Sequence, residues 1–147
     1  MTAPSRVLVT GAGGFTDRAL CTSLQAREYD VYGLSQKQSS DADTSSCSIV
    51  VGNLLDRESL ARALQEIRPL QVVHRAARAF VGSDDSAVFY LTNVTDTCNQ
   101  LDGARANSLE RVVVASNASV YGVPHDARPW GESFVPMPVD HDAASSW

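Results

Sequence analysis

Apolar and polar residues are arranged along the chain in blocks that predict short strands alternating with helices. Runs of consecutive apolar residues predict strands at residues 6–10, 30–34, 48–51, 71–74 and 111–115. Apolar residues at helical spacing predict helices at residues 16–27, 56–68 and 84–106, with another beginning near residue 142. The polar stretch 35–48 and the proline-rich stretch after residue 121 are typical of loops.

This alternation predicts a parallel sheet, because right-handed crossovers return each strand to the same direction. We expect one α/β domain over residues 1–147, a doubly wound sheet between two helical layers, with ligands at the carboxyl ends of its strands. The continuously apolar strand at 111–115 indicates burial on both faces. In the long helix, the expected inward stripe consists of Val88, Leu91, Val94, Cys98 and Leu101.

The amino-acid composition limits the kinds of partner that the chain can be expected to bind. The chain carries 12 basic and 17 acidic residues, a net charge of −5, without a basic cluster, which argues against nucleic acid or an anionic membrane surface. No apolar run approaches the roughly 20 residues of a membrane span. The cysteines, Cys21, Cys47 and Cys98, fit neither a disulfide framework nor a metal site. We therefore expect a cytoplasmic protein without a metal.

A glycine-rich turn follows the first predicted strand. Residues 10–14 read TGAGG, and the residues after them have the pattern of a first helical turn. A strand, a glycine turn and a helix start are the parts of a cradle for dinucleotide phosphates. Glycine lets the backbone approach the phosphates, and the free N–H groups of the helix start attract their charge.

Five motifs occur in order along the chain. They are TGAGGF at 10–15, VVHRAA at 72–77, Asn93 in the long helix, SNASVYG at 116–122 and PVDHDAASS at 138–146. Together they resemble the extended short-chain dehydrogenase/reductase family, in its epimerase/dehydratase branch that modifies nucleotide sugars. Within this branch, the motifs most resemble those of GDP-6-deoxy-hexulose reductases and GDP-mannose 4,6-dehydratases. The resemblance implies a Rossmann-type fold, NAD or NADP as cofactor, and a chain truncated before the C-terminal substrate-binding portion.

The resemblance also implies a set of cofactor-binding residues. They are Gly11, Gly13, Gly14, Phe15, Thr16, Ser35, Gln36, Asn53, Leu54, Ala76, Ala77 and Asn93. Ser35 and Gln36 stand where an acidic residue would bind the ribose 2′-hydroxyl, so the sequence leans slightly towards NADP. Asn53 stands where the family has an aspartate that contacts the adenine, and its amide retains the capacity to hydrogen-bond there.

Asp17 departs from the family pattern at the place of the third loop glycine. An acid near a helix N-terminus is mildly favourable in the empty protein. Beside a pyrophosphate roughly 6 Å away, however, the like charges would cost about 0.7–3 kcal/mol. We expect this charge to weaken cofactor binding by about three- to a hundred-fold.

The family's catalytic Ser/Thr, Tyr and Lys positions are all substituted, by Asn117, Asp142 and Ser146 respectively. The usual acid/base mechanism cannot run on this set, because Asp142 without a neighbouring cation is a poor acid at neutral pH. Asn117 retains hydrogen-bonding capacity towards a substrate oxygen, with Tyr121 as the only nearby phenol. Asp140 and Asp142 fit a helix cap better than a pair of catalytic carboxylates.

Three functions remain open. The first is an NAD(P)-dependent nucleotide-sugar reductase, epimerase or dehydratase, as the resemblance implies. The second is a module that holds a dinucleotide without turnover, and the third is a folded remnant without a ligand. A homodimer through the stripe of the long helix is an alternative to its packing on the sheet. His74, His125 and His141 share no metal-ligand spacing, so we expect structural or solvent-exposed roles for them.

Overall fold

The computed structural model describes residues 4–12, 15–36, 47–77, 87, 90–123 and 129–145, with the backbone alone for Phe15 and Asp142. Its parallel strands are β1 (Arg6–Thr10), β2 (Asp30–Ser35), β3 (Ser48–Val51), β4 (Gln71–His74) and β5 (Arg111–Val114). The helices are α1 (Phe15–Gln25), α2 (Arg57–Ile67), α4 (Thr95–Ala106) and α5 (His141–Ser145). A π-helical turn, η1 (Tyr90–Val94), precedes α4, and a 3₁₀ turn, η2 (Ala118–Tyr121), follows β5.

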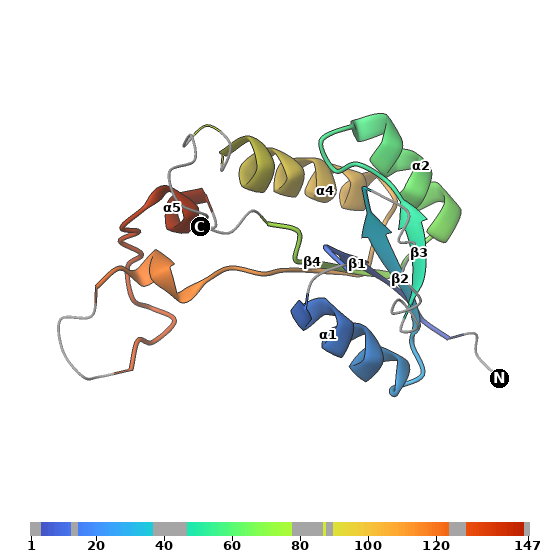
Figure 1. Ribbon diagram of the computed structural model, residues 1–147, viewed down its shortest axis with the longest axis horizontal. Helices are drawn as coiled ribbons and strands as arrows, with labels where there is room; N and C mark the ends of the chain where they lie inside the picture. Colours follow the sequence, from blue (N-terminus) through green and yellow to red (C-terminus); the bar gives the residue numbers. More distant parts are fainter. Residues whose placement is uncertain are drawn as a thin grey trace.

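The strand order β3-β2-β1-β4-β5 confirms the predicted doubly wound sheet. Helix α1 covers one face of the sheet, and α2 with α4 covers the other (Figure 1). Successive residues of β1 point to opposite faces, as the pleat of a strand requires. Leu8 therefore packs with α2, whereas Val7 and Val9 pack with Cys21 of α1. These two apolar layers fix the sheet between its helices.

Helix α2 begins and ends where the sequence predicts. Oδ1 of Asp56 accepts hydrogen bonds from the backbone N–H groups of Glu58 and Ser59, at 3.0 and 3.2 Å. Arg68, with φ of 49°, ends the helix in the left-handed conformation. The buried face consists of Leu60, Ala63, Leu64 and Ile67, which pack on the sheet.

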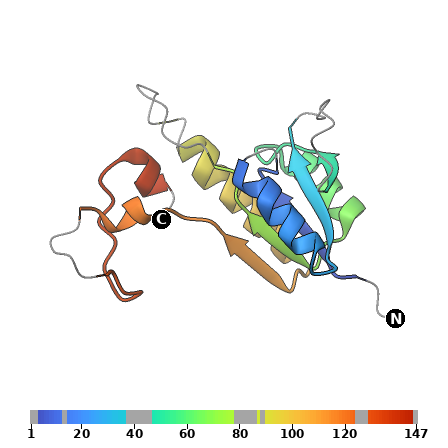
Figure 2. The same cartoon turned by 60° about the horizontal axis from the view of Figure 1, so that its bottom comes forward.

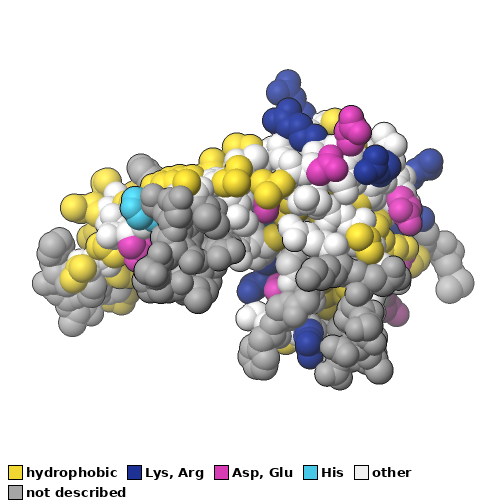
Figure 3. All heavy atoms as spheres, turned by 45° about the horizontal axis from the view of Figure 1, so that its top comes forward, with side chains coloured by type: hydrophobic (Ala, Val, Ile, Leu, Met, Phe, Trp, Pro, Cys, Tyr) yellow, Lys and Arg dark blue, Asp and Glu magenta, His cyan; other side chains and the backbone are white. Residues whose placement is uncertain are grey.

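The predicted inward stripe of the long helix is wrong for each of its described residues. Leu91, Val94 and Leu101 are 56%, 40% and 45% exposed, and Cys98 is also exposed. Val88 lies outside the described residues. Figure 3 shows hydrophobic side chains gathered along this face. The residues of η1 and α4 that turn inward are instead mostly polar, namely Asn93, Asp96, Asn99, Gln100 and Ala104.

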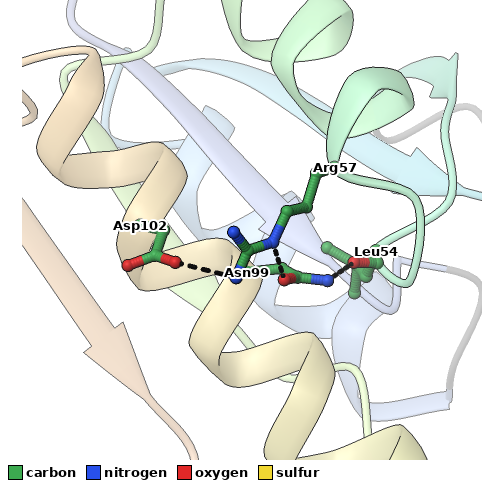
Figure 4. Close-up of polar contacts among 4 residues, drawn as sticks. All are labelled: Leu54, Arg57, Asn99 and Asp102. Carbon is green, nitrogen blue, oxygen red and sulfur yellow. Dashed lines mark hydrogen bonds and ion pairs between the residues drawn. The ribbon is translucent and has the colours of Figure 1, made fainter.

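Hydrogen bonds explain why a polar face of α4 turns inward (Figure 4). Nδ2 of Asn99 donates to the backbone carbonyl of Leu54 at 2.8 Å, and Nε of Arg57 donates to Oδ1 of Asn99 at 2.8 Å. Arg57 also pairs with Asp102 at 3.1 Å. A Cβ on Gly103 would lie 2.8 Å from Cδ1 of Leu64, so α2 and α4 approach closely there. Apolar spacing alone does not reveal these cross-element partners.

The expected burial of the fifth strand on both faces is also wrong. Val113 and Val114 are 49% and 44% exposed. Strand β5 pairs with β4 alone within the described part of the chain, so it forms an edge of the sheet.

The chain beyond β5 extends away from the sheet (Figure 2). Helix α5 packs against η1 and η2. Several apolar side chains of this part are exposed, namely Val123, Phe134, Val135, Met137 and Val139. None of the helices in the described ranges is long and apolar enough to cross a membrane.

Candidate nucleotide-binding site

A cavity of about 300 Å³ opens at the carboxyl ends of β1, β2, β3 and β4. Parallel strands bring these ends to the same edge of the sheet, where doubly wound folds bind their ligands. Its lining consists of Gly11, Leu34, Ser35, Gln36, Gly52, Leu54 and Ala76. Five predicted cofactor-binding residues, Gly11, Ser35, Gln36, Leu54 and Ala76, are therefore brought together here.

Gly11 is held in a conformation that favours glycine. Its φ is +81°, and a Cβ at this position would lie 3.1 Å from both Cα and N of Ala76. The turn after β1 therefore packs directly on the backbone after β4. Thr16 is exposed in the first turn of α1, which begins at Phe15. Gly13 and Gly14 lie outside the described residues.

The far wall of the cavity is built from the ends of β2 and β3. Nε2 of Gln36 lies 3.4 Å from Oδ1 of Asn53, which also accepts the N–H of Leu55 at 3.1 Å. The backbone N–H of Asn53 donates to Oγ of Ser59 at 3.1 Å. Leu54 is buried, with its carbonyl held by α4. Asn53 is thus fixed at the rim, beside the predicted ribose-binding residues.

A buried hydroxyl organises the opposite wall. Thr10 is fully buried at the end of β1, and its Oγ1 accepts the backbone N–H groups of Arg75 and Ala76 at 3.1 and 3.2 Å. The same oxygen lies 2.9 Å from Nδ1 of His74. Because Oγ1 already accepts two hydrogen bonds, its own hydrogen is donated to Nδ1. The loop after β4 is thereby tied to β1.

The tautomer of His74 follows from its second partner. Nε2 of His74 lies 3.1 Å from Oγ1 of Thr97, which donates its hydrogen to the carbonyl of Asn93 at 2.6 Å. Nε2 therefore carries the ring hydrogen, and the imidazole is neutral. Burial lowers the pKa of His74 from 6.5 to about 4, so the ring stays neutral at physiological pH. His74 has the structural role predicted from the sequence.

A second cavity, of about 220 Å³, adjoins the ends of β4 and β5. Ala76, Ala77 and Asn93 lie in its wall, so the predicted cofactor residues divide between two cavities that share Ala76. Nδ2 of Asn93 donates to Oγ of Ser145 at 2.9 Å, which joins η1 to α5. The wall also contains Arg75, Thr97, Val114 and Ala115.

Asp17 is buried, although the sequence suggested a charge facing the phosphates. It is 6% exposed, and its Oδ1 lies 2.5 Å from Nε of Arg75. Sequence reasoning missed Arg75 as the partner of Asp17. The available signal was that an acid at the glycine position and a base in the VVHRAA motif both directly follow strands, which places them at one sheet edge.

The predicted catalytic positions are only partly described. Oδ1 of Asn117 is buried without a hydrogen-bond partner in the described part of the chain, so it retains capacity for a ligand. The side chain of Asp142 and the whole of Ser146 lie outside the described residues. Asp140 fills the predicted capping role, because its Oδ1 accepts the N–H of Ala143 at 2.7 Å. Tyr121 stacks on Trp130, with ring centroids 5.4 Å apart.

The described residues contain no group of three or more His, Cys, Asp or Glu side chains that could hold a metal ion.

Comparison with known proteins identifies the family. The model of the NAD dependent epimerase/dehydratase family matches residues 7–143. A GDP-6-deoxy-D-talose 4-dehydrogenase of Aggregatibacter actinomycetemcomitans is 30% identical over 143 residues, covering 95% of this chain and 44% of that protein. A UDP-glucose 4-epimerase of Rhizobium meliloti is 27% identical, covering 97% of this chain and 44% of its own length.

A solved structure supports the same assignment. The UDP-glucose 4-epimerase of Thermus thermophilus, in complex with NAD, superposes with a TM-score of 0.87 and 30% identity over 96% of this chain and 47% of that one. The chain thus spans a little under half the length of these relatives. The matched segment contains the glycine turn, the end of β4 and the start of α5. The chain belongs to the NAD dependent epimerase/dehydratase family, as its motifs predict.

Proposed function

We propose that this chain is a dinucleotide-binding domain of the nucleotide-sugar epimerase/dehydratase type. The observation that carries the proposal is the cavity in which Gly11, Ser35, Gln36, Leu54 and Ala76 meet. These residues come from four chain segments, and the family resemblance implies a cofactor contact for each of them. The relative from Thermus thermophilus, solved in complex with NAD, supports the same ligand class.

The residues present fit a dinucleotide. Gly11 brings the backbone after β1 into contact with Ala76 and itself has no side chain that could block a phosphate. The 11-residue helix α1 begins directly after this turn, so its free N–H groups favour an anion. Gln36 and Asn53 supply amides at the rim for a ribose and an adenine. A bound nicotinamide would supply the hydride chemistry.

The choice between NAD and NADP depends on the end of β2. Ser35 and Gln36 provide no carboxylate to bind a ribose 2′-hydroxyl, which supports NADP. Two related UDP-glucose 4-epimerases were solved in complex with NAD, which supports the other cofactor. Titration with both cofactors measures the preference directly.

The proposed reaction class is oxidation and reduction at a nucleotide-sugar carbon, as in the relatives named above. Asn117 is the proposed donor to the substrate oxygen through its Nδ2 hydrogens, because it stands at the family's Ser/Thr position, at the start of η2. Its Oδ1, which has no hydrogen-bond partner within the described residues, can accept a hydrogen bond from the substrate. Asp142 and Ser146 occupy the remaining catalytic positions. Binding without turnover is the second candidate, and the loss of the Tyr and Lys types at these positions favours it.

A matched pair of glycine variants tests the proposed site. Gly11→Ala places a Cβ against the backbone of Ala76 at positive φ, whereas a Cβ on Gly131 meets nothing within 4 Å. Calorimetric titration with NADH and NADPH is expected to show saturable binding by the wild type and by Gly131→Ala. Binding by Gly11→Ala is expected to be at least ten-fold weaker. Equal affinities in all three proteins would reject the site.

We also propose a homodimer through the exposed apolar face of η1 and α4, formed by Tyr90, Leu91, Val94, Cys98 and Leu101. Such faces are typical of interfaces between protein chains. Leu91→Glu is expected to convert the dimer to a monomer in sedimentation equilibrium, whereas Val51→Glu, at an equally exposed strand position, is expected to leave it intact. A monomeric wild type would contradict this proposal.

The proposed location is the cytoplasm. Cys21, Cys47 and Cys98 are all free thiols in the structure, as in proteins of a reducing compartment.

A further inference from the structure

Asp17 and Arg75 face each other across the junction of α1 and β4. Asp17 lies in the first turn of α1, directly after the glycine turn, and Arg75 is the first residue after β4. Nε of Arg75 lies 2.5 Å from Oδ1 of Asp17. Both atoms are buried, and apart from this ion pair neither has a hydrogen-bond partner within the described ranges. The opposite charge of the other residue is therefore the main compensation available to each.

The backbone holds Arg75 in this place. Its N–H donates to Oγ1 of Thr10 at 3.1 Å, and the next N–H, that of Ala76, donates to the same oxygen. The side chain of Arg75 is 32% exposed and that of Asp17 is 9% exposed, so the pair is mostly shielded from water. An attraction between charges is screened much less in such surroundings than at the surface.

Stability alone does not account for the pair. Two charges lose hydration on burial, and a buried ion pair is often no more stable than apolar side chains of similar volume. The position gives a different reason. Asp17 replaces the glycine next to which a dinucleotide phosphate would lie. An uncompensated carboxylate there would repel the phosphate and lower the affinity for the dinucleotide by about three- to a hundred-fold.

We propose that Arg75 is a positioning residue for the dinucleotide. By pairing with Asp17, it cancels the negative charge in the first turn of α1 and holds that turn against the end of β4. The cradle can then accept a pyrophosphate without the third glycine of the motif. This inference rests on the proposed function, because it requires that the cradle binds a dinucleotide.

A double-mutant cycle tests the inference. The wild type, Arg75→Met, Asp17→Gly and the double variant are titrated with NADH by calorimetry, and with adenosine, which carries no phosphate. We expect Arg75→Met to weaken NADH binding by at least ten-fold and adenosine binding by less than two-fold. Asp17→Gly in the Arg75→Met background is expected to restore NADH affinity to within about three-fold of the wild type.

Matched controls separate charge from damage to the fold. Arg62→Met removes an exposed arginine from α2 and is expected to leave NADH affinity unchanged. Arg75→Lys retains the charge and is expected to bind NADH within a few-fold of the wild type, which keeps the test available if Arg75→Met does not fold.

The failures are distinguishable. Binding of NADH by Arg75→Met as tight as that of the wild type would overturn the role of Arg75 and leave the proposed function intact. An equal loss of adenosine and NADH binding without rescue by Asp17→Gly would make Arg75 merely structural and overturn the inference. A wild type that binds no dinucleotide would overturn both.

Discussion

The hydroxyl of Thr10 lies 2.9 Å from Nδ1 of His74, and both side chains are buried. This contact joins the last residue of β1 to the last residue of β4, the two strand ends that flank the glycine turn. Thr10 also accepts the N–H groups of the next two residues after β4. The shape of the candidate site therefore depends on one hydroxyl in the core.

Replacement of Thr10 by valine keeps the shape of the side chain and removes this acceptor. The buried N–H groups of Arg75 and Ala76 then lose their partner, which is expected to lower the free energy of unfolding by about 1–3 kcal/mol. Urea denaturation measures the difference. Thr16→Val, at an exposed position of α1, is the control and is expected to change stability by less than about 0.5 kcal/mol. Equal effects of the two changes would contradict the account.

His74 is expected to make stability depend on pH. Its pKa is lowered by burial from 6.5 to about 4, so the unfolded chain binds a proton between these values that the folded chain does not. His74 contributes on the order of 3 kcal/mol to the free energy of unfolding above pH 6.5. This contribution falls as the pH decreases and is lost near pH 4. The ring signals of His74 in NMR spectra are expected to stay at constant chemical shifts between about pH 5.5 and pH 8. A midpoint near 6.5 would rule out the neutral, buried ring.

Asp96 is expected to lower the stability of the fold as the pH rises, which is opposite to the effect of His74. Burial raises its pKa from 3.8 to about 6, so folding disfavours its charged form and the penalty grows as the pH rises from about 4 to above 6. Its Oδ1 has no hydrogen-bond partner within the described residues. Asp96→Asn is expected to raise the free energy of unfolding at pH 8 by about 1–3 kcal/mol, with little effect at pH 4. Denaturation at the two pH values, with Glu66→Gln at an exposed position of α2 as control, tests this. A variant less stable than the wild type at pH 8 is the contrary result.

Cys47 is expected to be the more reactive member of a thiol pair. It packs against the cluster that contains Cys21, and a hydrogen bond from Cys21 lowers the pKa of Cys47 to about 7. The hydrogen bond that Cys21 donates to Cys47, together with burial, raises the pKa of Cys21. The alkylation rate of Cys47 by iodoacetamide, followed by peptide mass spectrometry, is expected to have its midpoint near pH 7. In Cys21→Ala the midpoint is expected to rise, whereas an unchanged midpoint would show that Cys21 does not stabilise the thiolate.

The parallel sheet and the site edge were predictable because both follow from the alternation of strands and helices along the chain. Short apolar runs separated by helices allow few arrangements other than a parallel sheet, and the residues that follow its strands must share one edge. Ser35, Leu54 and Ala76 therefore meet around one cavity, as expected from their positions in the chain.

The orientation of α4 was not predictable from spacing, since it depends on distant partners. Asn99 turns inward because it hydrogen-bonds to the carbonyl of Leu54 and to the guanidinium of Arg57. Leu91 and Leu101 cannot form such hydrogen bonds through their side chains, and both are exposed. Arg75 was missed for the same reason. Its importance appears only when the structure places it against Asp17, which lies far away in the sequence.

The most direct test of the proposed site is hydrogen exchange of the wild-type chain with and without saturating NADH, resolved to peptides by mass spectrometry. A dinucleotide in the cradle is expected to slow exchange at residues 10–12, 33–36, 52–55 and 74–77, which surround the cavity. Residues 65–70, at the opposite end of the sheet, are expected to exchange at an unchanged rate. Unchanged exchange throughout the chain, or protection confined to residues 65–70, would contradict the assignment of this cavity as the nucleotide site.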